Sequence, residues 1–185
     1  LGGAIDAPAC DKLARFLQLC DAFALPVVSL CDTPGFMVGV ESEKTAMVRK
    51  TSRLFIIGST MRVPVFTVIL RKGYGLGAQA MAAGNFHAPM FTVSWPTGEF
   101  GPMGLEGAVR LGFRKELEAA PAAERDALFQ SMVAKSYERG KATNVAAYLE
   151  IDAVIDPADT RRWILAGMAS MPSRLPERRA IIDAW

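Results

Sequence analysis

The residues with the clearest chemical potential are glycines that end three similar segments. Residues 25–35, 63–73 and 88–98 each carry a proline in second place, continue as a largely apolar run, and reach a glycine nine residues after the proline. A stretch with helical periodicity follows each segment. A strand that ends in a glycine loop before a helix directs backbone N–H groups at a ligand, so each repeat predicts a corner that can hold an oxyanion.

The second corner is the strongest of the three. Residues 72–78 read Lys-Gly-Tyr-Gly-Leu-Gly-Ala and lead into a short segment of small residues. Arg71 and Lys72 lie beside these glycines, where positive charge would favour an anionic ligand. Close packing of a helix on a strand would also select glycines here, and both cations also fit a solvated surface. These interpretations stay open at this point.

Side chains offer few alternatives to backbone chemistry. His87 is the only histidine, and its place after a small-residue segment favours a surface or helix-end position. Cys31 ends an apolar strand with no evident base, which favours a core role. Glu99 and Glu106 flank a glycine loop, where they could act as acid–base groups; Glu99 could instead orient the loop by accepting backbone N–H bonds. This set of side chains favours a reaction in which no side chain of the protein acts as the base.

One motif points elsewhere and is rejected. The residues from Asp32 to Gly35 match the Asp-x-x-Gly element of GTPases. A GTPase also needs a phosphate-binding loop with the pattern G-x-x-x-x-G-K-[ST], and no segment matches it: Gly140-Lys141 is followed by Ala142, with Lys135 where the first glycine should stand. Nucleotide hydrolysis is therefore not expected.

The elements that must position these loops alternate between helix and strand. Apolar spacing predicts helices over 9–24, 41–61 and 78–83, a helix starting near 105, and helices over 121–138 and 158–171. Strands are expected over 25–31, 63–70 and 90–95, with a short edge strand at 152–157. Near-continuous apolar strands that alternate with helices predict an α/β fold with a parallel sheet and right-handed crossovers. The constant spacing from proline to glycine suggests turns of one spiral.

Composition restricts the class of protein. The chain has 185 residues, 51% hydrophobic and 22% charged, with a formal net charge of +2. This balance predicts one globular domain and gives no support for nucleic-acid binding. The uncharged stretch 73–98 is interrupted by Gln79, Asn85, His87 and Pro89, so we expect no membrane span. Three cysteines without metal-ligand spacing predict no metal site and indicate the cytoplasm. The start at Leu1, without methionine, suggests a piece of a longer polypeptide.

Five separated motifs then identify a family. They are Cys31–Gly39, Arg71–Gly77, Trp95–Glu99, Met103–Ala108 and Ile155–Arg161. In this order and spacing they closely resemble the C-terminal half of the carboxyltransferase component of biotin-dependent acyl-CoA carboxylases, a family that includes acetyl-CoA and propionyl-CoA carboxylases. The resemblance covers about 9–163. It implies a crotonase-like spiral of β-β-α repeats with parallel strands inside and helices outside, over residues 1–171, with 172–185 as a tail that could contact other subunits.

The resemblance also implies a mechanism and a site. The C-terminal half faces biotin, which a partner protein carries, and a carboxyl group passes from carboxybiotin to the α-carbon of an acyl-CoA. Backbone N–H groups of Leu76 and Gly77, with Ala78 beside them, would hold the ureido oxygen of biotin. The other biotin-binding residues expected by this analogy are Gly35, Phe36, Arg71, Lys72, Tyr74 and Gly75.

Partners and alternatives follow from the same resemblance. We expect an N-terminal carboxyltransferase half, a biotin carboxyl carrier, a biotin carboxylase component and a homo-oligomer, and no independent activity of this chain. Three alternatives stay open: a decarboxylase subunit that runs the transfer in reverse, a stand-alone crotonase-type hydratase or isomerase, and a non-catalytic assembly module.

Overall fold

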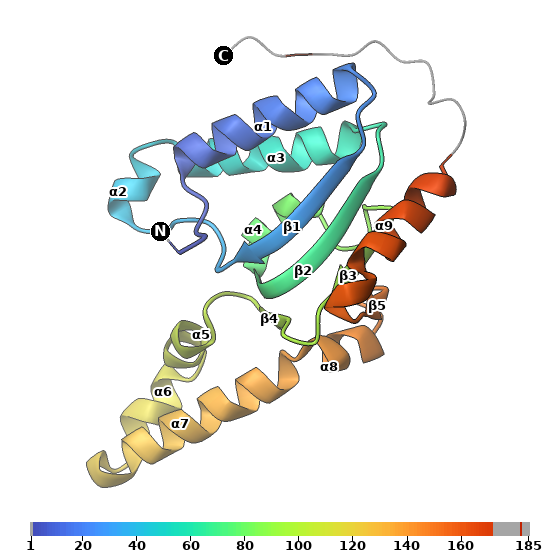
Figure 1. The fold of residues 1–185 in the computed structure, drawn as a ribbon. Coiled ribbons are helices and arrows are strands. Elements are labelled where there is room, and N and C mark those ends of the chain that lie inside the picture. Colours follow the sequence, from blue (N-terminus) through green and yellow to red (C-terminus); the bar gives the residue numbers. More distant parts are fainter. Residues whose placement is uncertain (1, 172–181, 183–185) are drawn as a thin grey trace.

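A parallel sheet forms the centre of the protein (Figure 1). The computed structural model describes residues 2–171 and 182. Within them, strand order is β1-β2-β3-β5, and β4 also pairs with β2; every one of these strand pairs is parallel. This confirms the expected α/β class with parallel strands. The strands are β1 (Val27–Thr33), β2 (Val65–Tyr74), β3 (Phe91–Ser94), β4 (Glu99–Gly101) and β5 (Ala153–Val154).

Helices cover both faces of this sheet, as the apolar strands require. On one face, α1 (Ala7–Ala22) and α3 (Met47–Thr60) lie side by side and bury Leu17, Leu54 and Ile57 with Val27 and Val65 of the strands. On the opposite face, α9 (Thr160–Ala169) packs against β2 and β3. Its Trp163 meets the ring of Phe91 edge to face, with 5.6 Å between the ring centroids.

The central strand β2 is longer than the sequence predicts, and this changes where the next helix begins. Between the pairs Cys31–Ile69 and Thr33–Gly73, β1 advances two residues while β2 advances four. The pairing of β2 with β1 therefore contains a bulge between Ile69 and Gly73, and β2 continues through it and pairs with β4 through Lys72, Gly73 and Tyr74. The prediction that the strand ends at 70 and that 73–77 is a loop was wrong, because the charged and glycine residues continue the strand past the bulge.

Helix α4 (Gly75–Met81) starts directly after β2, with no intervening loop. The sequence prediction placed its start at Ala78, which was wrong by three residues. Gly75 has a φ of +58°, in the left-handed region, and so turns the chain from the strand into the helix at a single residue.

The predicted helix over 41–61 is also divided. It forms the short α2 (Val40–Glu43) and the longer α3, and Ala46 between them has a φ of +57°. A left-handed residue cannot continue a right-handed helix, so the chain changes direction there. Apolar spacing alone did not reveal this break.

A group of helices projects from the sheet body (Figure 1). Helices α5 (Leu105–Gly112), α6 (Arg114–Ala119) and α7 (Ala122–Arg139) form this arm, and Val109, Phe129 and Val133 are its buried centre. Gly140 caps α7, which ends one residue beyond the predicted end at 138. The arm returns to the sheet through α8 (Ala142–Ala147) and the 3-10 turn η1 (Pro157–Asp159), which precedes α9.

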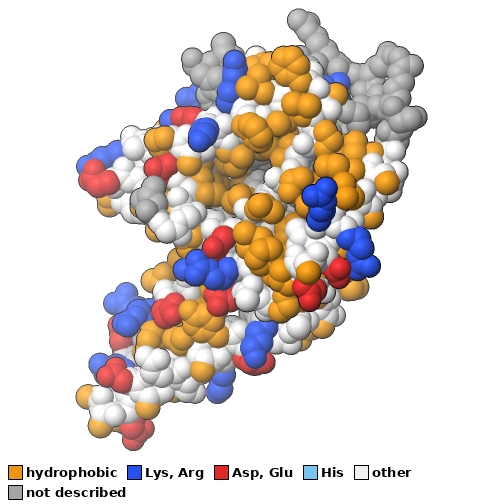
Figure 2. Space-filling model, viewed as in Figure 1, with side chains coloured by type: hydrophobic (Ala, Val, Ile, Leu, Met, Phe, Trp, Pro, Cys, Tyr) orange, Lys and Arg blue, Asp and Glu red, His pale blue; other side chains and the backbone are white. Residues whose placement is uncertain are grey.

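Part of the surface carries exposed apolar side chains. Figure 2 shows hydrophobic side chains gathered over the face of β1, and Val28 and Leu30 are exposed there. No helix of the described residues is both long and apolar enough to cross a bilayer. Most of the predicted tail, 172–181 and 183–185, lies outside the described residues, so its expected role in assembly stays a prediction.

Candidate functional site

Two of the glycine corners meet in the structure. A Cβ atom added to Gly77 would lie 2.7 Å from the Cα of Gly35 and 3.0 Å from the backbone nitrogen of Phe36. Real Cβ atoms do not approach backbone so closely, so only glycine lets the start of α4 touch the loop after β1. The structure thus brings together Gly35, Phe36 and Gly77, which the sequence analysis assigned to one pocket.

Hydrogen bonds with Ile5 and Thr33 hold the loop after β1 in place. Ile5 N–H donates to the carbonyl of Gly35, and Met37 N–H donates to the carbonyl of Ile5. Gly35 N–H donates to the buried hydroxyl of Thr33 at 3.1 Å. Ile5 thereby holds the outer side of the loop, while the Phe36 backbone nitrogen lies on the side that faces α4.

A second loop approaches α4 from another direction. A Cβ atom on Gly75 would lie 2.5 Å from the carbonyl oxygen of Pro102. The start of α4 therefore lies between the 35–36 loop and the loop at 102. Leu76, between Gly75 and Gly77, keeps 60% of its surface exposed. Pro102 was not expected at this site, and no pattern in the sequence pointed to its contact with Gly75.

The backbone donors at this corner are those of a helix start. The N–H groups of Gly75, Leu76 and Gly77 are in the first turn of α4, where no carbonyl four residues earlier belongs to the helix. The helix dipole also makes this end partly positive. Gly77 and Ala78 are buried, and Ala78 packs with Cys31 and Ile69 in the core. Of the three predicted catalytic residues, only Leu76 is exposed.

Asp32 ties the two strands together beside the glycine corners. Its carboxylate accepts the Lys72 N–H at 3.0 Å and the Arg71 Nη2 at 3.1 Å. Burial raises the pKa of Asp32, but the hydrogen bonds from Lys72 and Arg71 lower it by more, so the net pKa lies below the ordinary 3.8. Arg71, predicted to attract an anionic ligand, is thus paired with a carboxylate. The sequence analysis dismissed Asp32 with the GTPase motif and missed this structural role.

Replacing Asp32 with asparagine is expected to lower stability modestly, by less than about 1 kcal/mol, because the pair is largely exposed. A carboxyl whose pKa is depressed in the folded state stabilises the protein above its unfolded pKa, and this contribution is lost as the pH falls through the folded pKa. The difference in unfolding temperature between the wild type and Asp32→Asn should therefore persist at neutral pH and disappear in acid below the ordinary pKa of 3.8. Glu118→Gln, at an exposed pair with Arg114, is the control and should show little difference at any pH. A difference for Asp32→Asn that grows in acid would contradict this assignment.

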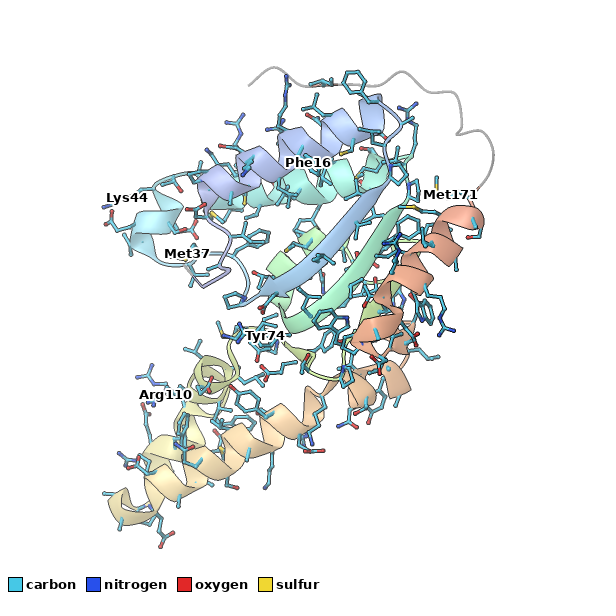
Figure 3. All side chains as sticks on the ribbon, viewed as in Figure 1. Phe16, Met37, Lys44, Tyr74, Arg110 and Met171 are labelled. Atoms are coloured by element: carbon cyan, nitrogen blue, oxygen red, sulfur yellow. The ribbon has the colours of Figure 1, made fainter. Side chains whose placement is uncertain are left out.

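Tyr74 lies where the sheet meets the arm (Figure 3). Its ring is buried, and its hydroxyl donates to Glu99 Oε2 at 2.9 Å. Burial and then this hydrogen bond raise the pKa of Tyr74, so it stays neutral. Glu99 therefore accepts the hydroxyl of a residue on the neighbouring strand, a partner that the sequence analysis did not consider. The predicted contact of Tyr74 with biotin stays a prediction.

The other groups considered for catalysis have restrained environments. Tyr137 donates its hydroxyl to Glu106 at 2.8 Å, and the Glu106 backbone N–H followed by this hydroxyl holds the pKa of that carboxyl below its usual range. Such a carboxylate stays ionised and is a poor general acid. Burial, followed by the charge of Asp32, raises the pKa of Cys31 to about 12, and its side chain is fully buried. The core role predicted for Cys31 is confirmed, and exposed His87 lies at a turn where its N–H donates to Asn85 Oδ1.

The fold and this corner define a parallel α/β protein in which the start of α4 lies between two backbone loops. Comparison with known proteins agrees with this fold and identifies the family. The family described as the carboxyl transferase domain matches residues 1–176, and the chain therefore belongs to this family. This confirms the family resemblance stated for the sequence and the crotonase-like fold that it implies.

Individual relatives share about a third of the sequence. The propionyl-CoA carboxylase carboxyltransferase subunit of Haloferax mediterranei is 37% identical over 93% of this chain. The methylmalonyl-CoA carboxyltransferase 12S subunit of Propionibacterium freudenreichii is 36% identical over 97% of this chain. The chain spans 33% and 34% of these two proteins, about a third of each.

Solved structures resemble the protein in three dimensions. A single-chain, multi-domain long-chain acyl-CoA carboxylase is 58% identical, with a TM-score of 0.79, over 90% of this chain and 16% of its own length. The transcarboxylase 12S subunit, described as a hexamer, is 33% identical, with a TM-score of 0.80, over 98% of this chain and 35% of its own.

Proposed function

We propose that this chain is the biotin-facing half of an acyl-CoA carboxyltransferase, in which a carboxyl group moves from carboxybiotin to the α-carbon of an acyl-CoA. The observation that carries the proposal is the contact of Gly77 with the Gly35–Phe36 backbone at the start of α4. The contact holds the amides at the start of α4 beside a second backbone loop. The chain belongs to a family of carboxyl transferases, in which such amides could bind the reacting oxygen.

We propose that the backbone amides at the start of α4 would hold the carbonyl of a cyclic urea. Side chains at Gly75 and Gly77 would occupy the space next to Pro102 and Gly35, so both glycines keep the backbone of α4 close to its neighbouring loops. Biotin, when bound, supplies the carboxyl group and then accepts a proton from the acyl-CoA. The chain itself would supply the N–H groups of Leu76 and Gly77 to the ureido oxygen, where negative charge develops. Such donors stabilise an oxyanion without a titratable side chain. This agrees with the structure, in which the carboxylates of Glu99 and Glu106 each accept a hydrogen bond from a tyrosine hydroxyl.

The Asp32 network would position these donors. By holding Lys72 and Arg71, Asp32 fixes the bulge from which β2 runs into α4. Tyr74, the residue before α4, is fixed by Glu99 on the neighbouring strand. Arg71 would then act as a structural partner of Asp32. Lys72 contacts Asp32 through its backbone N–H, so its ammonium group would be the one to attract an anionic ligand.

The partners belong to the proposal as well. Because the chain spans about a third of its relatives, it would act with an N-terminal carboxyltransferase half, a carrier of biotin and a biotin carboxylase component. Oligomeric assembly is described for the 12S relative as a hexamer, and we propose an oligomer here. The predicted cytoplasmic location is part of this proposal and is supported by three free, buried cysteines.

The test uses the chain joined to an N-terminal carboxyltransferase half, together with biotinylated carrier. The expected result is transfer of labelled carboxyl from carboxybiotin to an acyl-CoA. Net transfer only from a carboxylated acyl-CoA to biotin would favour the decarboxylase alternative. Hydration of an enoyl-CoA by the chain alone would favour the stand-alone hydratase, and no turnover with any of these substrates would leave the assembly module as the better interpretation.

A further inference from the structure

A large hollow lies between the sheet body and the arm, beside the helix start described above. Its volume is about 610 Å³, and residues of β2, α4, α5 and α7 contribute to its lining. Gly73 and Gly75 belong to its wall, whereas Leu76 and Gly77 are not among the described residues that line it. One end of the hollow therefore reaches the first residue of α4 without including the two predicted amide donors.

The lining is mostly apolar, although Gln79, Ser136, Arg139 and Glu150 also contribute to it. Phe86 and Phe100 stand edge to face, with ring centroids 5.7 Å apart, on one side. Helix α5 contributes Leu105 and Val109, and Phe113 follows at its end. Such a surface suits a hydrocarbon chain, because it offers extensive apolar contact and few groups that would need a hydrogen-bond partner.

The hollow is too large to be a defect in packing. Protein interiors are packed as closely as organic crystals, and their voids are rarely much larger than a water molecule. Sites for small molecules typically measure roughly 300–1,000 Å³ and are lined mainly by hydrophobic side chains. At about 610 Å³, this hollow lies in the range of ligand sites.

We propose that this hollow receives the aliphatic tail of a long-chain acyl-CoA, an inference that rests on the proposed function. Carboxyl transfer requires the acyl α-carbon close to the carboxyl donor at the start of α4, and a tail that extends from there reaches the hollow at Gly75. The greater identity to a long-chain acyl-CoA carboxylase, 58%, than to the propionyl-CoA carboxylase subunit, 37%, supports a long acyl group. The hollow would thus be the part of this chain that selects acyl length.

Two substitutions fill the hollow from different helices. Ala108 is half-buried on α5 and Val145 is half-buried on α8, and both line the hollow. Ala108→Phe and Val145→Phe each add a ring where the tail would lie. Ala147→Phe is the matched control, because Ala147 is exposed on the same helix as Val145 and is absent from the lining in the described part of the chain.

The experiment measures equilibrium binding of decanoyl-CoA and acetyl-CoA to the complete protein, alongside carboxyl transfer to the same two compounds. Each buried methylene should improve binding about fourfold, so we expect the wild type to prefer decanoyl-CoA by roughly a hundredfold or more. Each filling variant should weaken decanoyl-CoA binding by roughly tenfold or more and leave acetyl-CoA binding unchanged, while Ala147→Phe changes neither.

Three results would overturn the inference. They are equal affinity of the wild type for both compounds, unchanged decanoyl-CoA binding in both filling variants, and an equal loss for both compounds, which would indicate that biotin or the CoA moiety uses the hollow. Because the two variants lie on different helices, misfolding of one leaves the other as a test. Chain-length-dependent binding without any carboxyl transfer would contradict the proposed function alone and leave the hydrocarbon site supported.

Discussion

Replacing Gly77 with valine is expected to reduce carboxyl transfer by the complete enzyme by roughly a hundredfold or more, the typical effect of losing one oxyanion donor. The physical reason is steric. The first side-chain atom would lie 2.7 Å from the backbone of Gly35, so α4 and the Gly35–Phe36 loop would have to separate. The N–H groups of Leu76 and Gly77 would then leave the position proposed for binding the ureido oxygen. Steady-state transfer from carboxybiotin measures the effect.

The control for this prediction is another glycine in a helix. A Cβ atom on Gly112, at the end of α5, meets nothing within 4 Å, so Gly112→Val should retain most of the transfer activity. Thermal unfolding of both variants separates loss of the site from loss of the fold. A Gly77→Val enzyme that transfers carboxyl groups at the wild-type rate would rule out the site assignment.

Replacing Phe66 with alanine is expected to cost about 3–5 kcal/mol of stability, the range for removing a fully buried aromatic ring. Phe66 has no exposed surface and its ring lies 5.3 Å, centroid to centroid, from that of Phe91. A Cβ atom on Gly167 of α9 would lie 2.6 Å from the Phe66 ring, so the helix packs directly on this ring. The substitution would thus weaken the attachment of α9 to the central strand.

Denaturant unfolding followed by tryptophan fluorescence measures this loss, because Trp163 of α9 contacts Phe91. Phe23→Ala is the control, since Phe23 is 70% exposed and should contribute less than about 1 kcal/mol. A loss below about 1 kcal/mol for Phe66→Ala would show that α9 does not depend on this contact.

The order of strands and helices was largely predictable from local signals. Apolar runs with proline at their start gave the central strands, since such runs can only be buried between two helical layers. Helix ends were predictable where a residue such as Gly140 stops the helix by its own conformational preference. The break at Ala46 was not, because alanine favours helix and only the surrounding structure holds it at positive φ.

The site was predicted in part. The motifs identified Gly35, Phe36, Leu76 and Gly77 as belonging together, and the structure places three of them in contact. The partners Asp32 with Arg71 and Tyr74 with Glu99 were missed, because each pair joins residues from separate strands whose register no local pattern specifies.

The sequence by itself favoured one type of chemistry: glycines at strand ends and few candidate acid–base side chains favour backbone donors, since conformational freedom and residue type are local properties. Only the tertiary structure decided that the first and second glycine corners touch, that β2 continues through a bulge into α4, and that a hollow opens beside it. These features depend on strand register and on distances between segments far apart in the chain, which packing of the whole protein sets.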